Sequence, residues 1–325
     1  MFNINPISFF KSLFKKDTIF DTGLIPSPLD YNDIPMEAVS TLENPTPESY
    51  KIPYKLTMKN QLSTPKCVAY TGSTIKEYFE RKEGQSIEFD PDWLYAKCKE
   101  IDGIPNVQGT YFRVMLKVLK NVGCKPVGGM ESDAAKYRIG GYLQVPCNIE
   151  SVKRSIYEFG TTLLGFYLGA GSWNTAYVKN IKPTVAAHAT TGIGFDANYV
   201  QGQNSFGAGW GDNGYFYFNE SYLPFESWSV LVDLPNNWQD LLPDKNAKPK
   251  YVFNTDLFIT LNHPDVKVLQ DCLKYIGCMD KSQESTGYFG TITQNAVKVL
   301  QARYNIQGTG RVGPITRAKL NELFA

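Results

Sequence analysis

Apolar residues recur at helical spacing through the first part of the chain. One such stretch follows Pro65, a residue tolerated at a helix entrance, and it contains Val68, Ala69, Thr71, Ile75, Tyr78 and Phe79. Asp90 and Pro91 are the residue types of an N-cap and a first turn, which predicts a second helix. The apolar stripe between residues 111 and 119 predicts a third helix, which Gly123 ends. This part of the chain is therefore predicted to be helical.

The pattern changes to that of β-strands between residues 142 and 218. Runs of β-branched, aromatic and small residues cover residues 160–169, 185–195 and 214–218. One helix is predicted at residues 149–159. A helical half thus precedes a β-rich half, which predicts an α+β fold. Because binding sites tend to lie where such halves meet, we expect a groove between them.

The last part of the chain returns to helical spacing. Residues 233–251 are polar, contain prolines and show no periodicity, which is typical of a linker. Apolar residues then recur at helical intervals over residues 265–276, 292–304 and 315–324. Two similar glycine turns, at residues 287–293 and 310–316, precede the second and third of these segments. The chain is therefore predicted to end in a small all-α three-helix domain.

Composition excludes several classes of function. The chain has 325 residues, of which 42% are hydrophobic and 20% charged, with a net charge of +1. This length suffices for two domains, and no dense basic run suggests nucleic-acid binding. No apolar stretch is long enough to cross a bilayer as a transmembrane segment. Six cysteines are too few for a dense disulfide framework, and the redox compartment stays open.

Cys67 stands where the first predicted helix begins, six residues after Gln61. A thiol at a helix N-terminus lies near the positive end of the helix dipole, which favours the reactive thiolate. The Gln61 amide can point to the same place as the Cys67 backbone N–H, and two such donors beside a nucleophile form an oxyanion hole. The spacing indicates a nucleophilic cysteine; for these residues alone, a buried structural cysteine is the alternative.

Two downstream residues extend this pattern. His188 lies in a predicted strand, and Asn204 opens the sequence Asn-Ser-Phe-Gly-Ala-Gly-Trp-Gly-Asp-Asn-Gly-Tyr. The order Gln, Cys, His, Asn, together with this asparagine motif, resembles the papain family of cysteine peptidases. The resemblance implies a papain-like two-lobed α+β fold. It also implies that Cys67 is the nucleophile, that His188 is its acid–base partner, that Asn204 orients His188, and that Gln61 is an oxyanion donor.

The resemblance also implies a substrate-binding groove. Gly109 and Thr110 would form an edge that hydrogen-bonds an extended peptide, and Tyr111 would face a side-chain pocket beside it. The other residues expected at the groove are Ala186, Ala187, Ala189, Phe206 and Trp210. This chain lacks the family's tryptophan after the nucleophile, and Phe206 stands in place of the tryptophan that covers the His–Asn hydrogen bond. None of these differences removes a group that performs chemistry.

The C-terminal segment resembles a second family. The Leu-Gln of its first predicted helix, Gly-x-Phe-Gly-x-x-Thr at 287–293 and Gly-x-Val-Gly-Pro-x-Thr at 310–316 are similar to motifs of the small peptidoglycan-binding domain. We therefore divide the chain into an N-terminal extension (1–24), a papain-like peptidase domain (25–235), a linker (236–254) and a peptidoglycan-binding-like domain (255–325). The second histidine, His263, lies in this last domain, so no metal or cofactor is predicted.

Together the resemblances predict a cysteine endopeptidase targeted to bacterial cell wall, as in a phage or bacterial lytic enzyme. Its partners would be a peptide or protein substrate and, through residues 255–325, peptidoglycan or another wall glycan. Such an enzyme would be extracellular or wall-associated. Because no clear signal peptide is seen, we expect it to be virion-borne or released on lysis. Two alternatives stay open, a catalytically inactive wall-binding adaptor and a transpeptidase that forms a thioester.

The N-terminal extension lacks the length of the inhibitory prodomains in plant and lysosomal relatives. Residues 20–56 carry many prolines and are predicted to wrap the enzyme surface as an extended lead-in. We hypothesise that residues 1–24 partly cover the active site.

Overall fold

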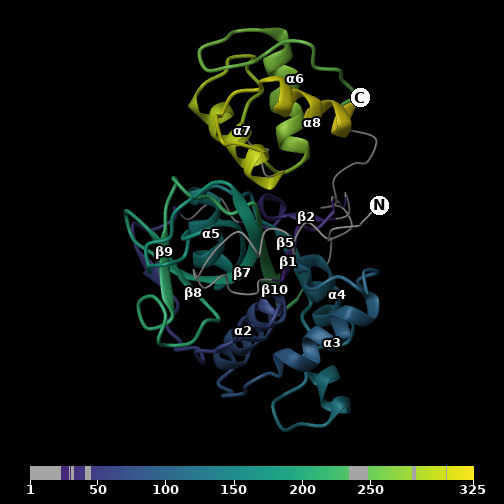
Figure 1. The fold of residues 1–325 in the computed structure, drawn as a ribbon, viewed down its shortest axis with the longest axis vertical. Coiled ribbons are helices and arrows are strands. Elements are labelled where there is room, and N and C mark those ends of the chain that lie inside the picture. The colour runs from purple at the N-terminus through teal and green to yellow at the C-terminus, as the bar shows by residue number, and fades with distance from the viewer. Residues whose placement is uncertain are drawn as a thin grey trace, which may run out of the picture.

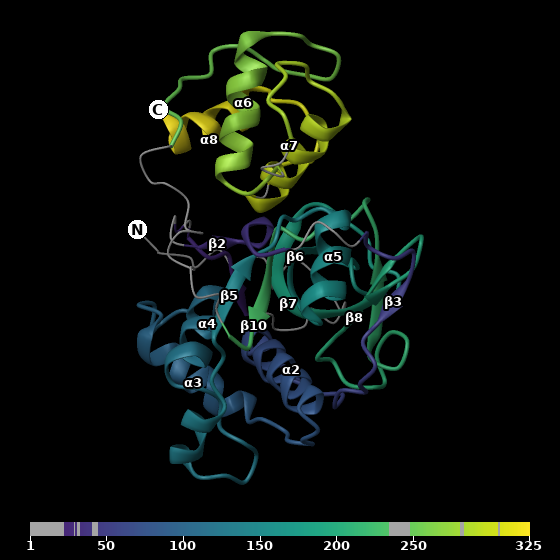
Figure 2. The ribbon, with the colours of Figure 1, turned by 180° about the vertical axis from the view of Figure 1, so that it is seen from behind.

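The computed structural model describes residues 23–28, 30, 33–40, 45–233, 248–279, 283–304 and 306–325. Most of the predicted extension at 1–24 and of the predicted linker at 236–254 lies outside these residues. No helix of the described part is long and apolar enough to cross a membrane. A helical lobe lies at one end of the molecule and the C-terminal domain at the other, with a sheet between them (Figure 1, Figure 2).

The described residues of the helical lobe form three helices: α2 (Cys67–Lys82), α3 (Pro91–Ile101) and α4 (Phe112–Asn121). The start of α3 follows the predicted chemistry, because Asp90 accepts hydrogen bonds of 3.0 Å from the N–H groups of Asp92 and Trp93 while Pro91 fills the first turn. Helix α2 is buried along most of its length, since α3 and α4 pack on one side of it and the sheet packs on another.

An eight-stranded sheet forms the second lobe of the described structure. Its order is β2-β5-β10-β6-β7-β8-β9, and β3 also pairs with β7. The strands are β2 (Ile34–Pro35), β3 (Tyr50–Lys51), β5 (Gly141–Gln144), β6 (Thr162–Gly169), β7 (Thr184–Phe195), β8 (Val200–Gln203), β9 (Tyr215–Phe218) and β10 (Glu226–Leu231). The long strand β7 packs against α2, and it also contacts helix α5 (Ile149–Phe159). The packing of β7 against α2 brings residues that are far apart in the sequence close together.

The C-terminal domain contains three helices in its described residues: α6 (Pro264–Tyr275), α7 (Thr291–Arg303) and α8 (Pro314–Phe324). One buried glutamine organises the turn between α6 and α7. Gln270 accepts a 3.0 Å hydrogen bond from the N–H of Gly287, and its amide donates to the Tyr288 carbonyl (3.0 Å) and the Thr293 hydroxyl (2.9 Å). The glutamine of α6 thereby fixes the glycine turn and the first turn of α7.

The turn between α7 and α8 repeats this arrangement. Gln301 accepts from the N–H of Gly310 (2.8 Å) and donates to the Arg311 carbonyl (2.8 Å) and the Thr316 hydroxyl (3.0 Å). The sequence echo between residues 287–293 and 310–316 thus has a physical cause, because each motif supplies the glycine N–H and the threonine that one buried glutamine binds. Helix α7 belongs to both repeats.

The C-terminal domain packs directly against the β lobe. The Tyr167 hydroxyl on β6 donates a 3.0 Å hydrogen bond to the carbonyl of Arg303 at the end of α7. Cys147, which follows β5, is buried in the same apolar core as Leu269 and Leu300 of the C-terminal domain. All six cysteines, including Cys147, are buried free thiols. The two parts are therefore joined by side-chain packing as well as by the chain between them.

We expect Gln301→Ala to destabilise the C-terminal domain by about 3 kcal/mol, because it leaves a buried N–H, a carbonyl and a hydroxyl without their partner. Native-state hydrogen exchange of the α7 amides in the full chain measures this loss. Gln307→Ala, at an exposed position of the same turn, is the matched control. Equal protection in the two variants would show that the glutamine does not organise the turn.

Candidate active site

The predicted catalytic residues come from elements far apart in the sequence. Cys67 is the first residue of α2, His188 lies within β7, and Asn204 directly follows β8. The packing of α2 against β7 brings the first two together, and the backbone N–H of Ala189, next to His188, lies close enough to the Cys67 sulfur to favour its thiolate. The four predicted catalytic residues, Gln61 included, are all buried.

His188 and Asn204 form the central hydrogen bond of the site. His188 Nε2 lies 2.8 Å from Asn204 Oδ1. Because an amide oxygen only accepts, Nε2 carries the proton, and the lone pair of a neutral ring is then on Nδ1. His188 Nδ1 is buried and has no hydrogen-bond partner among the described residues. The ring thus presents a free basic nitrogen in the site.

Aromatic side chains enclose the imidazole. The Phe206 ring stacks on the His188 ring with centroids 4.6 Å apart, and Trp173 meets the same ring edge-on at 5.3 Å. Trp210 stacks on Trp173 at 5.7 Å, and its indole N–H donates to the Trp173 carbonyl at 3.0 Å. Sequence reasoning placed Phe206 and Trp210 here but missed Trp173, which lies outside the asparagine motif. The sequence signal for Trp173 is that a large aromatic residue stands among small residues at 169–175.

Gln61 is tied to the loop that carries Asn204. Its backbone N–H donates to the Ser205 carbonyl (2.8 Å), and its side-chain oxygen accepts from the Ser205 hydroxyl (2.6 Å). Its amide nitrogen donates to the Thr64 carbonyl at 2.8 Å. These bonds hold the Gln61 amide in the turn that leads into α2, close in sequence to the nucleophile.

Burial sets the protonation of the two reacting groups. Loss of water raises the pKa of the Cys67 thiol to about 11, against the opposing effect of backbone N–H groups that include those of Gly23 and Ala189. Burial also lowers the pKa of His188 to about 4, although the bond to Asn204 works the other way. Burial of both groups therefore opposes the thiolate that the helix dipole favours.

The chain itself covers Cys67. The backbone N–H of Gly23 donates to the Cys67 sulfur at 3.2 Å, and the Gly23 carbonyl accepts from the N–H of Thr110 at 2.8 Å. A Cβ on Gly23 would overlap the carbonyl oxygen of Pro65, so only glycine fits. A peptide N–H, and not a carbonyl carbon, thus faces the thiol, which leaves the segment unsuited to attack.

The covering segment continues as a short strand. β1 (Leu24–Ile25) pairs in parallel with β4 (Thr110–Tyr111). Gly109, with φ of +91°, lies so close to the Gly23 carbonyl that a Cβ there would overlap it. The edge at which we predicted substrate binding thus pairs with this chain's own segment, and substrate binding there stays a prediction. The hypothesis that residues 1–24 reach the site applies to the described residues 23 and 24, but the cover extends further.

Arg113 on α4 holds the far end of this cover. Its guanidinium forms a two-point ion pair with Asp33, one N–O distance being 3.0 Å, and also donates to the Pro28 carbonyl. Its backbone N–H donates to the Ser27 hydroxyl at 3.2 Å. Arg113 and Asp33 are both buried. Sequence reasoning gave neither residue a role, since nothing in the local pattern pairs two charges 80 positions apart.

The three alanines near His188 do not share one pocket. Successive side chains of a strand point to opposite faces, so Ala187 and Ala189 lie on one face of β7 and Ala186 on the other. Ala187 and Ala189 belong to the apolar core that contains α2. Ala186 therefore faces away from Ala187 and Ala189, so the three alanines expected at the groove do not line one surface.

Among the described residues, no group of three or more histidine, cysteine, aspartate or glutamate side chains could hold a metal ion. His263 caps α6 instead, where its Nδ1 accepts from the N–H of Asp265 at 3.2 Å.

Comparison with known proteins identifies both parts. The model of the family described as "Putative peptidoglycan binding domain" matches residues 262–320, and no curated protein matches the chain. Xylellain, a cysteine protease from Xylella fastidiosa, superimposes with a TM-score of 0.58 at 18% identity, over 69% of this chain and all of xylellain.

Two proforms are also similar. Procathepsin B from Trypanosoma congolense has a TM-score of 0.52 at 14% identity, over 65% of this chain and 86% of that one. The proform of the ragweed pollen cysteine protease Amb a 11 has a TM-score of 0.50 at 17% identity, over 65% and 72%. The chain thus combines a papain-like cysteine protease fold with a C-terminal domain that matches the peptidoglycan-binding family model.

Proposed function

We propose that the chain is a latent cysteine endopeptidase that acts at the bacterial cell wall. The observation that carries the proposal is the His188–Asn204 hydrogen bond, which leaves Nδ1 as a free base beside the element that bears Cys67. A histidine oriented by a third group next to a thiol is the arrangement that nucleophilic catalysis by cysteine requires.

In the first half of the reaction, the Cys67 thiol gives its proton to His188 Nδ1 and its sulfur attacks the carbonyl carbon of a peptide bond. The new C–S bond converts the carbonyl into a tetrahedral oxyanion, which the Cys67 backbone N–H and the Gln61 amide stabilise. His188 then returns the proton to the leaving nitrogen as the C–N bond breaks. This releases an amine and leaves a thioester on Cys67.

In the second half, water replaces the amine. His188 takes a proton from the water as its oxygen attacks the thioester, and the C–S bond breaks to give a carboxylic acid and the free thiol. Asn204 holds the ring at Nε2 throughout, so Nδ1 serves both halves. Phe206 shields that hydrogen bond from water by stacking on the ring.

Latency follows from the position of Gly23. Its N–H occupies the place beside the sulfur where a substrate carbonyl has to lie, and the cover contributes to the burial that keeps the thiol neutral. Displacement of residues 23–28 would admit water and substrate to Cys67, which reduces the burial that raises the pKa of its thiol. Activity therefore requires the cover to move or to be cut.

Binding to the wall is proposed for the C-terminal domain. A pocket of about 370 Å³ lies beside its second glycine turn and is lined by residues that include Asp256, Arg311 and Ile315. Ile315 is 72% exposed although it is apolar. Polar groups around an exposed apolar surface suit a glycan or peptide ligand. Attachment there would raise the local concentration of the peptidase at its substrate.

Gly23→Ala is expected to unmask the nucleophile, because its Cβ cannot fit against Pro65. Labelling of Cys67 by an epoxide probe at pH 7 should accelerate at least about tenfold. The labelling rate of the wild type should keep rising with pH toward about 11, the pKa of the covered thiol, whereas that of the variant should level off at lower pH. Gly308→Ala, with open space around it, is the control; equal rates in wild type and Gly23→Ala would contradict the cover.

In the Gly23→Ala background, a peptide library should be cleaved, and Cys67→Ala should abolish cleavage. Gln61→Ala should lower turnover on the order of a hundredfold, the usual cost of one oxyanion donor. Mass analysis of the products distinguishes hydrolysis from transfer to another amine. Cleavage that survives Cys67→Ala, or a Gly23→Ala protein that takes up the probe but cuts no peptide or wall fragment, would refute the peptidase.

Wall binding is tested by co-sedimentation of the full-length Cys67→Ala protein with purified peptidoglycan. Ile315→Asp should weaken binding by about tenfold, because it puts a charge at the apolar edge of the pocket. Ile292→Asp changes the equivalent residue of the first repeat, which is 55% exposed, and should bind as the parent does. If both variants bind like the parent, this pocket is not the wall site.

A further inference from the structure

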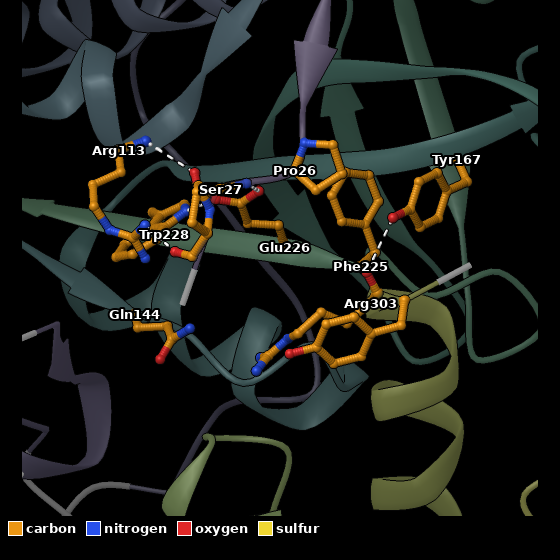
Figure 3. A pocket seen from close by; sticks show the side chains of 11 residues that line it. Pro26, Ser27, Arg113, Gln144, Tyr167, Phe225, Glu226, Trp228 and Arg303 are labelled. Atoms are coloured by element: carbon orange, nitrogen blue, oxygen red, sulfur yellow. Dashed lines mark hydrogen bonds between the residues drawn. The ribbon is translucent and has the colours of Figure 1, made fainter. Parts of the chain in front are cut away.

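A pocket of about 310 Å³ lies where the cover, the β lobe and the C-terminal domain meet (Figure 3). Residues of the papain-like part that line the pocket include Arg113, Gln144 and Glu226. The C-terminal domain contributes Arg303 and Tyr304. The two residues from the C-terminal domain follow one another at the end of α7. This pocket is therefore a feature of the two-domain chain and not of its papain-like part alone.

An extended peptide already occupies one side of this pocket. Ser27 donates its backbone N–H to Glu226 Oε2 at 3.0 Å, and Glu226 Oε1 accepts from the Trp228 indole at 2.8 Å. The Pro28 carbonyl accepts from Arg113. Figure 3 shows Ser27 between the Arg113 and Glu226 side chains. The pocket thus binds a peptide backbone through a carboxylate acceptor and a guanidinium donor.

The cover links this pocket to Cys67. Gly23 lies on Cys67, Leu24 and Ile25 pair with β4, and Pro26 to Pro28 line the pocket. At about 3.3 Å per extended residue, the pocket begins about 10 Å from the sulfur. A peptide that replaced the cover would therefore meet the C-terminal domain three to five residues from the point where Gly23 now lies.

The wall from the C-terminal domain is held firmly. The Arg303 carbonyl accepts from Tyr167 on β6 at 3.0 Å, and its guanidinium donates to the Ile276 carbonyl at 2.5 Å. The Gln144 side chain approaches Gly277 so closely that an added Cβ would lie 3.3 Å from its oxygen. Contacts on both sides of Arg303 fix it relative to the groove.

Two of the three charged side chains named in this pocket have an ion-pair or hydrogen-bond partner that satisfies their charge, and the third, Arg303, has no carboxylate partner in the described part of the chain. Arg113 is paired with Asp33, and Glu226 binds Ser27 and Trp228. Among the described residues, no carboxylate lies within 4.0 Å of the Arg303 guanidinium. Arg303 is thus the charged group of this pocket that can still accept an anionic partner.

We propose that the C-terminal domain completes the substrate groove, and that the groove selects peptides with an acidic side chain at the position that meets Arg303. The bound peptide donates a backbone N–H to Glu226, as Ser27 does, and its carboxylate pairs with Arg303. This inference deepens the proposed function and rests on it, because it names the substrate class of the same groove.

The test measures peptide binding separately from cleavage. The protein is the full chain with Gly23→Ala and Cys67→Ala, which frees the groove and removes the nucleophile. The probes are fluorescent synthetic peptides that copy residues 22–30 and carry Glu, Gln or Lys in place of residue 26, 27 or 28. At one of these positions, the Glu peptide should bind about tenfold more tightly than the Lys peptide by fluorescence anisotropy.

Arg303→Gln should reduce this ratio to less than twofold. Gln144→Glu, which leaves Arg303 in place but adds a competing carboxylate to the pocket, should do the same and carries the test if Arg303→Gln fails to fold. Lys267→Gln, which removes an exposed cation of α6 that does not line the pocket, should keep the ratio. The proposal is overturned if no position discriminates Glu from Lys, or if the ratio survives both pocket variants. Failure of the peptidase itself would appear instead in the cleavage assay, with binding preference intact.

Discussion

The contact between the Gly23 N–H and the Cys67 sulfur decides the chemical state of the whole site. It covers the thiol while aromatic rings enclose the imidazole, and burial holds both groups in their neutral forms. The contact needs glycine at position 23 and at position 109, because the backbone of the cover lies too close to its neighbours for any side chain. Close backbone packing at Gly23 and Gly109 thus keeps the Cys67 thiol covered.

Much of this architecture can be predicted from local chemistry. The N-cap at Asp90, the strand that carries His188 and the asparagine motif are short-range patterns, and each forms as predicted. The two glycine turns were visible as an echo, and the structure adds the reason, which is one buried glutamine for each turn. Helix and strand existence depends on neighbouring residues, so the sequence is informative about it.

What escaped prediction depends on contacts between distant parts of the chain. The helix dipole argues for a low thiol pKa, but the burial that reverses it comes from a segment 44 residues away. The buried pair of Arg113 and Asp33 and the packing of Cys147 into the C-terminal core have no local signature. The strand assignment was right for residues 186–189, yet the alternation of faces separates Ala186 from Ala189. Local sequence patterns therefore predict where helices and strands lie better than which distant residues pack against them.

The six cysteines have a consequence for how the chain matures. All are thiols enclosed by packing, so no covalent cross-link has to form or reshuffle before the fold is complete. Folding can therefore finish in a reducing medium, and a later passage into an oxidising one finds no sulfur at the surface to react. The same enclosure protects Cys67 from oxidation until the segment over it departs, so the proposed peptidase would keep its thiol reduced across both environments.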